Sequence, residues 1–222
     1  MSSHSEDFAP EQASQQSIVE AQREPNALIV VDVQRGFDDP AWGPRNNPDC
    51  DDNIRLLLSA WRSTGQPIVL VRHDSTTPGS PLTPGQPGND FKDGIDGPHD
   101  LLVVKSVNSS FLGTPDLAAW LRTAGIRAVT ICGITTNHCC ETTARMAGNL
   151  GFTARFVIDA THTFDRVSRH GELVTADELA RISAINLDQE FAEILTTSEV
   201  LAQTGIAADS TLRRSLQGFL SG

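Results

Sequence analysis

Two polar side chains end apolar runs of the sequence, and a thiol follows a third run. Asp32 and Lys105 each close a run that is typical of a buried strand, and Cys139 comes shortly after another such run. Taken singly, Asp32 is typical of a turn cap and Lys105 of a strand end that reaches solvent. Together with a thiol they indicate nucleophilic chemistry, because an ammonium near a thiol favours its reactive, ionised form.

Cys139 lies in the segment 133–141, Gly-Ile-Thr-Thr-Asn-His-Cys-Cys-Glu, which joins a predicted strand to a predicted helix through a short turn. A free thiol is only a few per cent ionised at neutral pH, with a pKa of about 8.5. The positive end of a helix dipole and a nearby ammonium stabilise the thiolate, so we expect Cys139 to be a nucleophile. The other cysteines, Cys50, Cys132 and Cys140, are expected to be small buried hydrophobes.

The elements that must position these groups alternate along the chain. Strands are predicted at 27–32, 67–72, 101–105, 127–132, 154–158 and 193–196. Helices are predicted at 51–64, from Thr114-Pro115 to Gly125, at 137–150, and from a Thr175 cap to about Leu187. This alternation predicts an α/β fold: a three-layer α/β/α sandwich with a doubly wound, mainly parallel six-stranded sheet of the Rossmann-like kind. Ligands of such sheets bind at the carboxyl ends of the strands.

The chain divides into three predicted parts. Residues 1–26 are polar and are expected to form a flexible arm, residues 27–203 the folded domain, and residues 204–222 an extension with helix-compatible apolar spacing. Two loops, 35–49 and 74–100, are long and rich in Gly, Pro and Asp. Loops of this kind are functional or simply solvated. The solvated alternative fits the second loop better.

Charge and composition exclude several classes of protein. The 222 residues carry a net charge of −11, which repels phosphate backbones, so we expect no nucleic-acid partner. The longest clean apolar stretch, 27–31, is strand-sized, and residues 1–26 hold no apolar signal segment, so we expect no membrane association. The four cysteines do not form a disulfide scaffold, which favours reduced thiols and a cytoplasmic location.

Five motifs resemble the isochorismatase-like cysteine hydrolase superfamily, to which nicotinamidases and N-carbamoylsarcosine amidohydrolases belong. They are Asp-Val-Gln-Arg-Gly-Phe at 32–37, Lys-Ser-Val-Asn-Ser-Ser-Phe at 105–111, Gly-Ile-Thr-Thr-Asn-His-Cys at 133–139, the run at 141–152, and Asp-Ala-Thr-His at 159–162. The resemblance spans roughly residues 27–203, with the motifs in the family's order. The combination is specific, although each motif alone is weak.

The resemblance implies an Asp–Lys–Cys catalytic triad. Cys139 would be the nucleophile, Asp32 would take the thiol proton and later give it to the departing amine, and Lys105 would stabilise the thiolate and orient Asp32. It also implies a cis peptide bond between Ile134 and Thr135, with the N–H groups of Thr135 and Cys139 forming an oxyanion hole. The implied enzyme is a cysteine hydrolase that cleaves a C–N bond of a small amide or ureido compound through a thioester, releasing ammonia or an amine.

Departures from the family patterns narrow this expectation. Isochorismatases that cleave a vinyl ether lack the nucleophilic cysteine, so its presence favours C–N chemistry. Nicotinamidases hold a metal with several histidines, whereas this chain offers only His73 and, further along, His99, so we expect no metal and no cofactor. Both histidines are left between a substrate contact and an ordinary capping or exposed role.

The predicted substrate pocket contains Gln34, Phe37, Trp42, Ser109 and Phe111, and the expected partner is a small-molecule amide. The resemblance also suggests a homodimer or homotetramer. Two alternatives stay open: a hydrolase of a non-amide compound such as an ester or an isochorismate-type vinyl ether, and a non-catalytic binding or redox-sensing protein in which Cys139 is a sensor thiol. A sensor thiol needs a low pKa but has no use for Asp32.

Overall fold

A computed structural model describes residues 25–203 of the chain. The predicted N-terminal arm, apart from its last two residues, and the predicted C-terminal extension at 204–222 lie outside the described residues. The first strand begins at Asn26, so the folded region starts where the apolar pattern predicts it to start.

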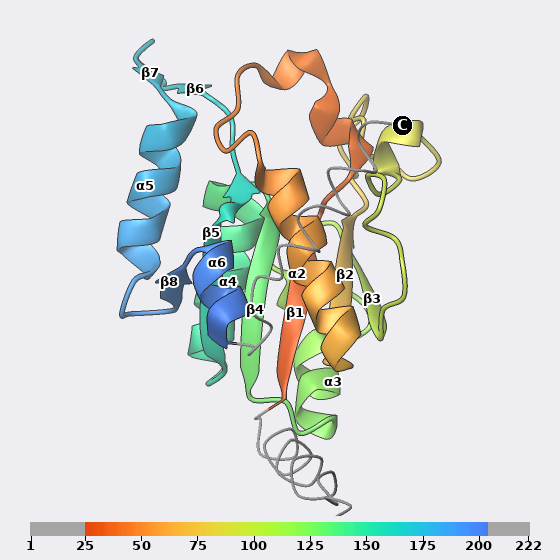
Figure 1. Cartoon of the computed structure of the whole chain (residues 1–222). Coiled ribbons are helices and arrows are strands. Elements are labelled where there is room, and N and C mark those ends of the chain that lie inside the picture. The colour runs from red at the N-terminus through yellow and green to blue at the C-terminus, as the bar shows by residue number, and fades with distance from the viewer. Residues whose placement is uncertain (1–24, 204–222) are drawn as a thin grey trace, which may run out of the picture.

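Six parallel strands form the central sheet, in the order β3-β2-β1-β4-β5-β8. The predicted α/β fold is confirmed, since helices cover both faces of this sheet (Figure 1). The chain winds outward in both directions from β1 and β4, so the strand order reverses between these two neighbours. The strands are β1 (Asn26–Val31), β2 (Ile68–His73), β3 (Leu101–Lys105), β4 (Ala128–Ile134), β5 (Thr153–His162) and β8 (Glu193–Leu195).

Apolar side chains on alternate sides of the strands build two cores. Leu28 and Val30 face α2 (Cys50–Thr64) and α6 (Thr197–Gln203), which lie in front of the sheet in Figure 1. Ile29 and Val31 face the opposite layer. That layer consists of α3 (Leu117–Thr123), α4 (Glu141–Asn149) and α5 (Ala176–Leu187). Because both faces are covered, β1 is buried at all of its residues, as its continuous apolar run predicts.

The predicted start of the helix at 114–125, which is α3 in the structure, is wrong. Thr114 does not cap it, because the Thr114 backbone exchanges two 2.8 Å hydrogen bonds with Val104 beside β3. The cap is Asp116, whose side chain accepts a 3.0 Å hydrogen bond from the N–H of Ala119. The Thr175 cap of α5 is confirmed, and Glu178 completes a capping box there.

The two long loops contain short helical turns and buried residues. Residues Leu82, Asn89, Lys92 and Ile95 anchor the segment 74–100 in the protein, while much of the rest of it is exposed to solvent. Whether this loop has a function remains open. Short helical turns interrupt the connections. These are η1 (Arg35–Asp38), η2 (Pro40–Trp42), η3 (Pro87–Asn89), η4 (Ser110–Leu112) and the π-helical turn η5 (Thr136–Cys140).

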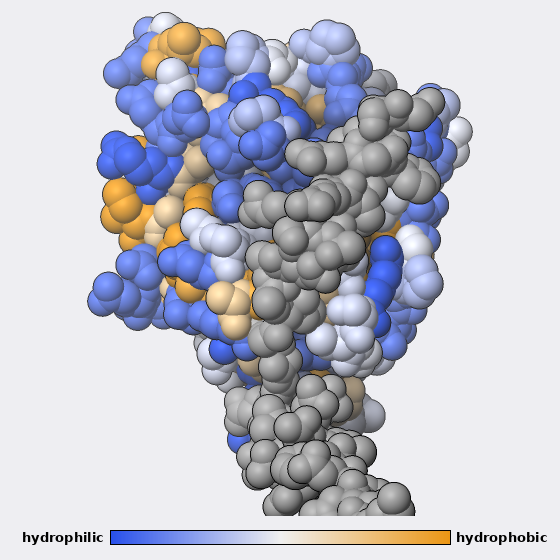
Figure 2. All heavy atoms as spheres, in the orientation of Figure 1, coloured by the Kyte–Doolittle hydropathy of each residue, from blue (hydrophilic) through white to orange (hydrophobic). Residues whose placement is uncertain are grey.

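A small hairpin that the sequence did not predict follows β5. It consists of β6 (Arg166–Val167) and β7 (Leu173–Val174), and it leads into α5. Large apolar side chains are exposed here: Val167 and Leu173 on the hairpin, and Ile182 and Ile185 on α5. Figure 2 shows apolar surface over this side of the molecule, on a face that is otherwise largely hydrophilic.

Candidate active site

The site lies at the carboxyl ends of β1 and β4, where the strand order reverses. Asp32 follows β1 directly and adopts a left-handed backbone (φ 53°), so the chain turns sharply and the side chain lies over the end of the sheet. The two strands approach closely at Gly133 (φ 129°), where a Cβ atom would collide with the carbonyl of Val31. Glycine is therefore required for β1 and β4 to bring Asp32 and the turn η5 together.

Lys105 reaches this point from the edge of the sheet. It ends β3, two strands from β1, and neighbouring strands are about 4.8 Å apart, so about 10 Å separates the two backbones. The long lysine side chain passes His73, its partner in register at the end of β2, and covers part of this distance. The Asp32 side chain and the hydrogen bond between the two residues cover the rest. The side chains of Lys105 and Asp32 have no solvent exposure.

The Lys105 ammonium contacts three acceptors. Nζ lies 2.6 Å from Asp32 Oδ2, 3.2 Å from His73 Nδ1 and 3.4 Å from Cys139 Sγ. An ammonium has three N–H groups and no lone pair, so each of these atoms accepts one hydrogen bond. The structure thus brings together the three predicted triad residues, and it adds His73 to them.

The same geometry bears on the prediction of no metal. The ligand atoms of Asp32, His73 and Cys139 all lie within 4.8 Å of one another, as they would around a metal ion. The Lys105 ammonium is within 3.4 Å of each of the three residues. The Lys105 ammonium thus contacts the same three residues that could ligate a metal ion, and two cations this close would repel each other. That the site holds no metal remains a prediction.

The sequence predicts surroundings that stabilise the Cys139 thiolate, whereas in the folded site burial favours the thiol. Burial and, after it, the Asp32 carboxylate raise the pKa of its thiol to about 12, although Lys105 opposes the shift. The sulfur also lies in the π-helical turn η5, ahead of α4, rather than in the first turn of that helix. Cys139 is therefore a protonated thiol at neutral pH, and Asn108 Oδ1, 3.7 Å away, is within reach of its S–H.

Asp32 is suited to take that proton. Burial raises the pKa of its carboxyl above the ordinary value, although Lys105 opposes the shift, so Asp32 is a stronger base than an exposed carboxylate. Its Oδ1 is buried and has no hydrogen-bond partner among residues 25–203. Burial also opposes the charge of Lys105, but Asp32 and Cys139 outweigh it and raise the pKa of the ammonium. The pair thus combines a fixed cation with a carboxylate oxygen that is free to accept.

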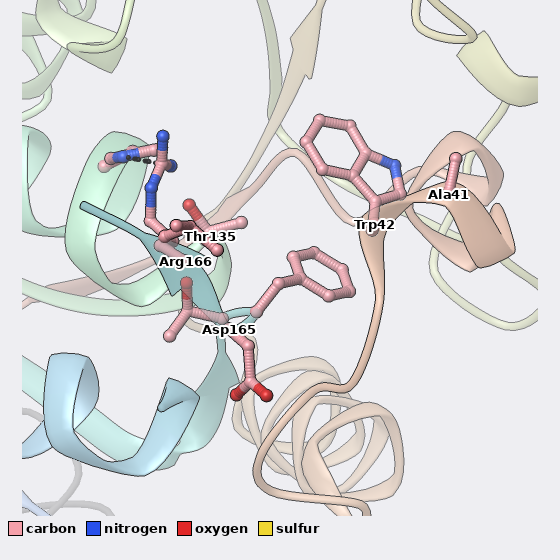
Figure 3. A pocket seen from close by; sticks show the side chains of 9 residues that line it. Ala41, Trp42, Thr135, Asp165 and Arg166 are labelled. Atoms are coloured by element: carbon pink, nitrogen blue, oxygen red, sulfur yellow. Dashed lines mark hydrogen bonds between the residues drawn. The ribbon is translucent and has the colours of Figure 1, made fainter. Parts of the chain in front are cut away.

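Thr135 directly precedes the turn η5, which carries Cys139, and it also lines an open cavity. The Ile134–Thr135 peptide bond is cis. The carbonyl of Thr135 accepts 3.2 Å hydrogen bonds from the N–H groups of His138 and Cys140, which fixes the turn that carries Cys139. Thr135 and His138 also line the cavity, which has a volume of about 280 Å³ (Figure 3). The role of the Thr135 and Cys139 N–H groups as an oxyanion hole remains a prediction.

The side chains of three predicted substrate-binding residues make hydrogen bonds or ring contacts within the protein and do not line the cavity. Gln34 is fully buried, and its side chain bonds to the backbone N–H and carbonyl of His73 and to the carbonyl of Asn89. The Ser109 hydroxyl accepts from the N–H of Phe111. The Phe111 ring stacks in the core on Phe152, with centroids 5.7 Å apart. In this structure, then, these side chains hold the walls of the site and do not face the cavity.

Phe37 and Trp42 form an aromatic cluster with Phe164. The Trp42 ring lies 5.3 Å from Phe37 and 5.4 Å from Phe164, centroid to centroid. Phe37 and Phe164 are buried, whereas Trp42 is 38% exposed and lines the cavity (Figure 3). Trp42 is therefore the predicted pocket residue that a ligand can contact directly.

The other wall of the cavity, opposite Trp42, was not predicted from the sequence. The segment 163–167, which follows β5, lines it, and His138 contributes from η5. The motif at 159–162 could have pointed to this wall, because the residues that follow it leave β5 at the same edge of the sheet as Asp32. His99 lies elsewhere, in an exposed turn with its Nδ1 2.9 Å from the carbonyl of Gly97.

Comparisons with known proteins agree with this architecture. Residues 26–199 match the model of the Isochorismatase domain family. An isochorismatase family protein of Bacillus subtilis, YrdC, is 41% identical over 80% of this chain and 95% of its own length. The crystal structure of an isochorismatase family protein from Chromobacterium violaceum superimposes with a TM-score of 0.77 at 40% identity, covering 83% of this chain and 95% of that chain.

A third relative is further away. Nicotinamidase 3 of Arabidopsis thaliana is 29% identical over 88% of this chain and 93% of its own length. Among the described residues, no helix is long and apolar enough to cross a membrane. The matched domain spans most of the chain, the sheet is the predicted doubly wound parallel sheet, and Asp32, Lys105 and Cys139 from three of the motifs meet at one edge of it. The chain therefore belongs to the isochorismatase family of hydrolases.

Proposed function

We propose that this protein is a metal-independent cysteine hydrolase that cleaves a C–N bond of a small amide or ureido compound. The observation that carries the proposal is the buried ammonium of Lys105, which lies 2.6, 3.2 and 3.4 Å from Asp32, His73 and Cys139. The family relationship supports it, since nicotinamidase, an amidase by name, is among the relatives.

In the first half of the proposed reaction, the Cys139 thiol turns its proton to Asp32 Oδ1, the carboxylate oxygen without a partner. The sulfur attacks the carbonyl carbon, and the N–H groups of Thr135 and Cys139 stabilise the oxyanion that forms. Asp32 then gives its proton to the leaving nitrogen, the C–N bond breaks, and ammonia or an amine departs. The acyl group remains on Cys139 as a thioester.

In the second half, a water molecule attacks the thioester carbonyl while Asp32 accepts one of its protons. The C–S bond breaks, the carboxylic acid leaves, and Asp32 returns the proton to the sulfur. Lys105 keeps its charge throughout and stabilises each negative charge in turn on Asp32 and Cys139. The net reaction consumes one amide bond and one water molecule.

The geometry favours this function over a redox sensor. Sensor cysteines react because their pKa is low and they are accessible. The pKa of Cys139 is raised to about 12 and the residue is only 8% exposed, so its thiol is unreactive until a neighbouring base takes the proton. Asp32 is that base, and a base of this kind serves a hydrolase.

The test is ammonia release from a panel of small amides and ureido compounds, with Cys139→Ala as the variant. We expect the substitution to lower kcat/KM at least about a thousandfold, because the nucleophile is lost. Cys140→Ala is the matched control, since it removes the neighbouring, fully buried thiol and should leave kcat/KM within about tenfold. Mass spectrometry of the wild type during turnover should show an acyl adduct on Cys139. Undiminished ammonia release by Cys139→Ala would overturn the proposal.

A further inference from the structure

The cavity lined by Thr135 and His138, two residues close to Cys139 in the sequence, has two unlike walls. One is aromatic and consists of Trp42 stacked on Phe164, with centroids 5.4 Å apart. The other carries Arg166, which Figure 3 shows across the cavity from Trp42, with Thr135 between them. A ligand in this cavity therefore meets an apolar ring surface on one side and a guanidinium on the other.

Within the described residues, the charge of Arg166 is not neutralised by an ion pair. Its Nη1 lies 2.9 Å from His138 Nε2, and a guanidinium can only donate, so His138 is the acceptor and is neutral. Burial and then Arg166 lower the pKa of His138, although Glu141 opposes the shift. Among residues 25–203, no carboxylate forms an ion pair with Arg166.

The one acidic residue in the cavity wall is already engaged. Asp165 Oδ1 accepts a 2.7 Å hydrogen bond from the N–H of Ala176 at the start of α5. In Figure 3 its carboxylate points away from both Trp42 and Arg166. A negative charge that enters the cavity therefore meets Arg166, whose other N–H groups are available, while Asp165 faces the helix terminus.

A guanidinium with free N–H groups matches a carboxylate, which it binds with two parallel hydrogen bonds. The His138 contact restricts how the guanidinium turns, so its fork is partly preorganised for such a partner. Neutral amides gain nothing from this charge. The arrangement selects substrates that carry an anionic group besides the bond to be cleaved.

We propose that this cavity is a carboxylate-binding subsite, and that the substrates are amides that bear a carboxylate of their own. The carboxylate binds Arg166, the body of the molecule lies against Trp42, and the carboxamide reaches Thr135 and Cys139. This assignment of the substrate class rests on the proposed function, because it takes the reacting carbonyl to lie at Cys139.

The test measures binding to the Cys139→Ala variant, which does not turn the ligands over. The probes are 3-carbamoylbenzoate and succinamate, each paired with its neutral methyl ester, and the readout is calorimetry. We expect at least one carboxylate to bind at least about tenfold more tightly than its ester. Adding Arg166→Gln should abolish this preference, and Arg166→Lys should keep part of it, since lysine retains the charge without the fork.

Arg169→Gln is the matched control, because it removes an exposed positive charge from the same hairpin, outside the cavity wall. It should leave the preference intact. Equal binding of acids and esters, no binding of either acid, or a preference that survives Arg166→Gln would each overturn the subsite. A preference for carboxylates without any amide hydrolysis by the wild type would contradict the proposed function alone. Hydrolysis of carboxylate-bearing amides that Arg166→Gln leaves unchanged would contradict the subsite alone.

Discussion

Three acceptors from three different elements surround one cation at the residue scale. Asp32 follows β1, His73 ends β2, and Cys139 lies in η5, yet all three bond to the ammonium of Lys105. His73 accepts through Nδ1, so its ring is neutral with the proton on Nε2. Burial and then Lys105 lower the pKa of His73, in line with this neutral form. His73, for which the sequence left open a substrate contact or a capping role, accepts a hydrogen bond from the Lys105 ammonium.

The raised thiol pKa predicts an unusual alkylation profile. Because the pKa of Cys139 is about 12, its reaction with iodoacetamide should keep rising about tenfold per pH unit up to about pH 10. An ordinary thiol levels off near its pKa of about 8.5. Peptide mapping of the labelled protein, with Cys139→Ala as the blank, isolates the rate at this residue. A plateau near neutral pH would show that Cys139 is a low-pKa thiol after all.

Replacing Asp32 sharpens the same measurement. The Asp32 carboxylate raises the pKa of Cys139, so Asp32→Asn should lower that pKa and speed alkylation at pH 8. Hydrolysis should fall at the same time, because the proton acceptor is gone. Faster labelling with lost turnover separates the two roles of this carboxylate. Slower labelling of Asp32→Asn would contradict the electrostatic account.

At the scale of elements, Gln34 connects the loop 74–100 to the end of β2. Its side chain accepts from the N–H of His73 at 2.8 Å and donates to the carbonyls of His73 and Asn89 at 3.1 and 2.8 Å. These groups are buried or partly buried, and the His73 carbonyl also accepts a 3.1 Å hydrogen bond from Asn89 Nδ2. Without Gln34, the N–H of His73 and the carbonyl of Asn89 would therefore each lose a hydrogen-bond partner. The residue thus holds His73 in place beside Lys105, and the loop over it, without facing the ligand.

Gln34→Ala is therefore expected to destabilise the fold. The loss of these bonds to buried backbone groups should lower the free energy of unfolding by about 2–4 kcal/mol, measured by urea denaturation. Limited proteolysis should then cut faster within 74–100. Gln86→Ala, an exposed substitution in the same loop, is the control and should change stability by less than about 0.5 kcal/mol. Equal stability of the two variants would show that the Gln34 hydrogen bonds do not stabilise the fold.

At the scale of the whole molecule, the strand order assembles the site. Asp32 and Lys105 are 73 residues apart in the chain, and Lys105 and Cys139 are 34 apart. They meet because parallel strands end at one edge of the sheet and because β1 and β4 are neighbours there. The hairpin β6–β7 extends from the same edge and completes the cavity with Arg166.

The homodimer or homotetramer suggested by the resemblance remains a prediction. Four large apolar side chains are exposed on the hairpin and α5, and burying them would favour self-association: Val167, Leu173, Ile182 and Ile185. Sedimentation equilibrium should give a mass near two or four times the 23.9 kDa of one chain. A mass of one chain at micromolar concentration would contradict the prediction.

The sequence by itself determined the order of the elements and the residues able to do nucleophilic chemistry. Apolar runs and caps are local signals, so five of the six strands of the sheet and the α5 cap were found within a few residues, while β5 extends to His162. Only the tertiary structure decided the protonation of Cys139, the place of His73 and the Arg166 wall. The protonation of Cys139 depends on burial, which lowers the local dielectric, and on charges from distant segments, which shift its pKa. The places of His73 and Arg166 depend on how segments far apart in the sequence pack together.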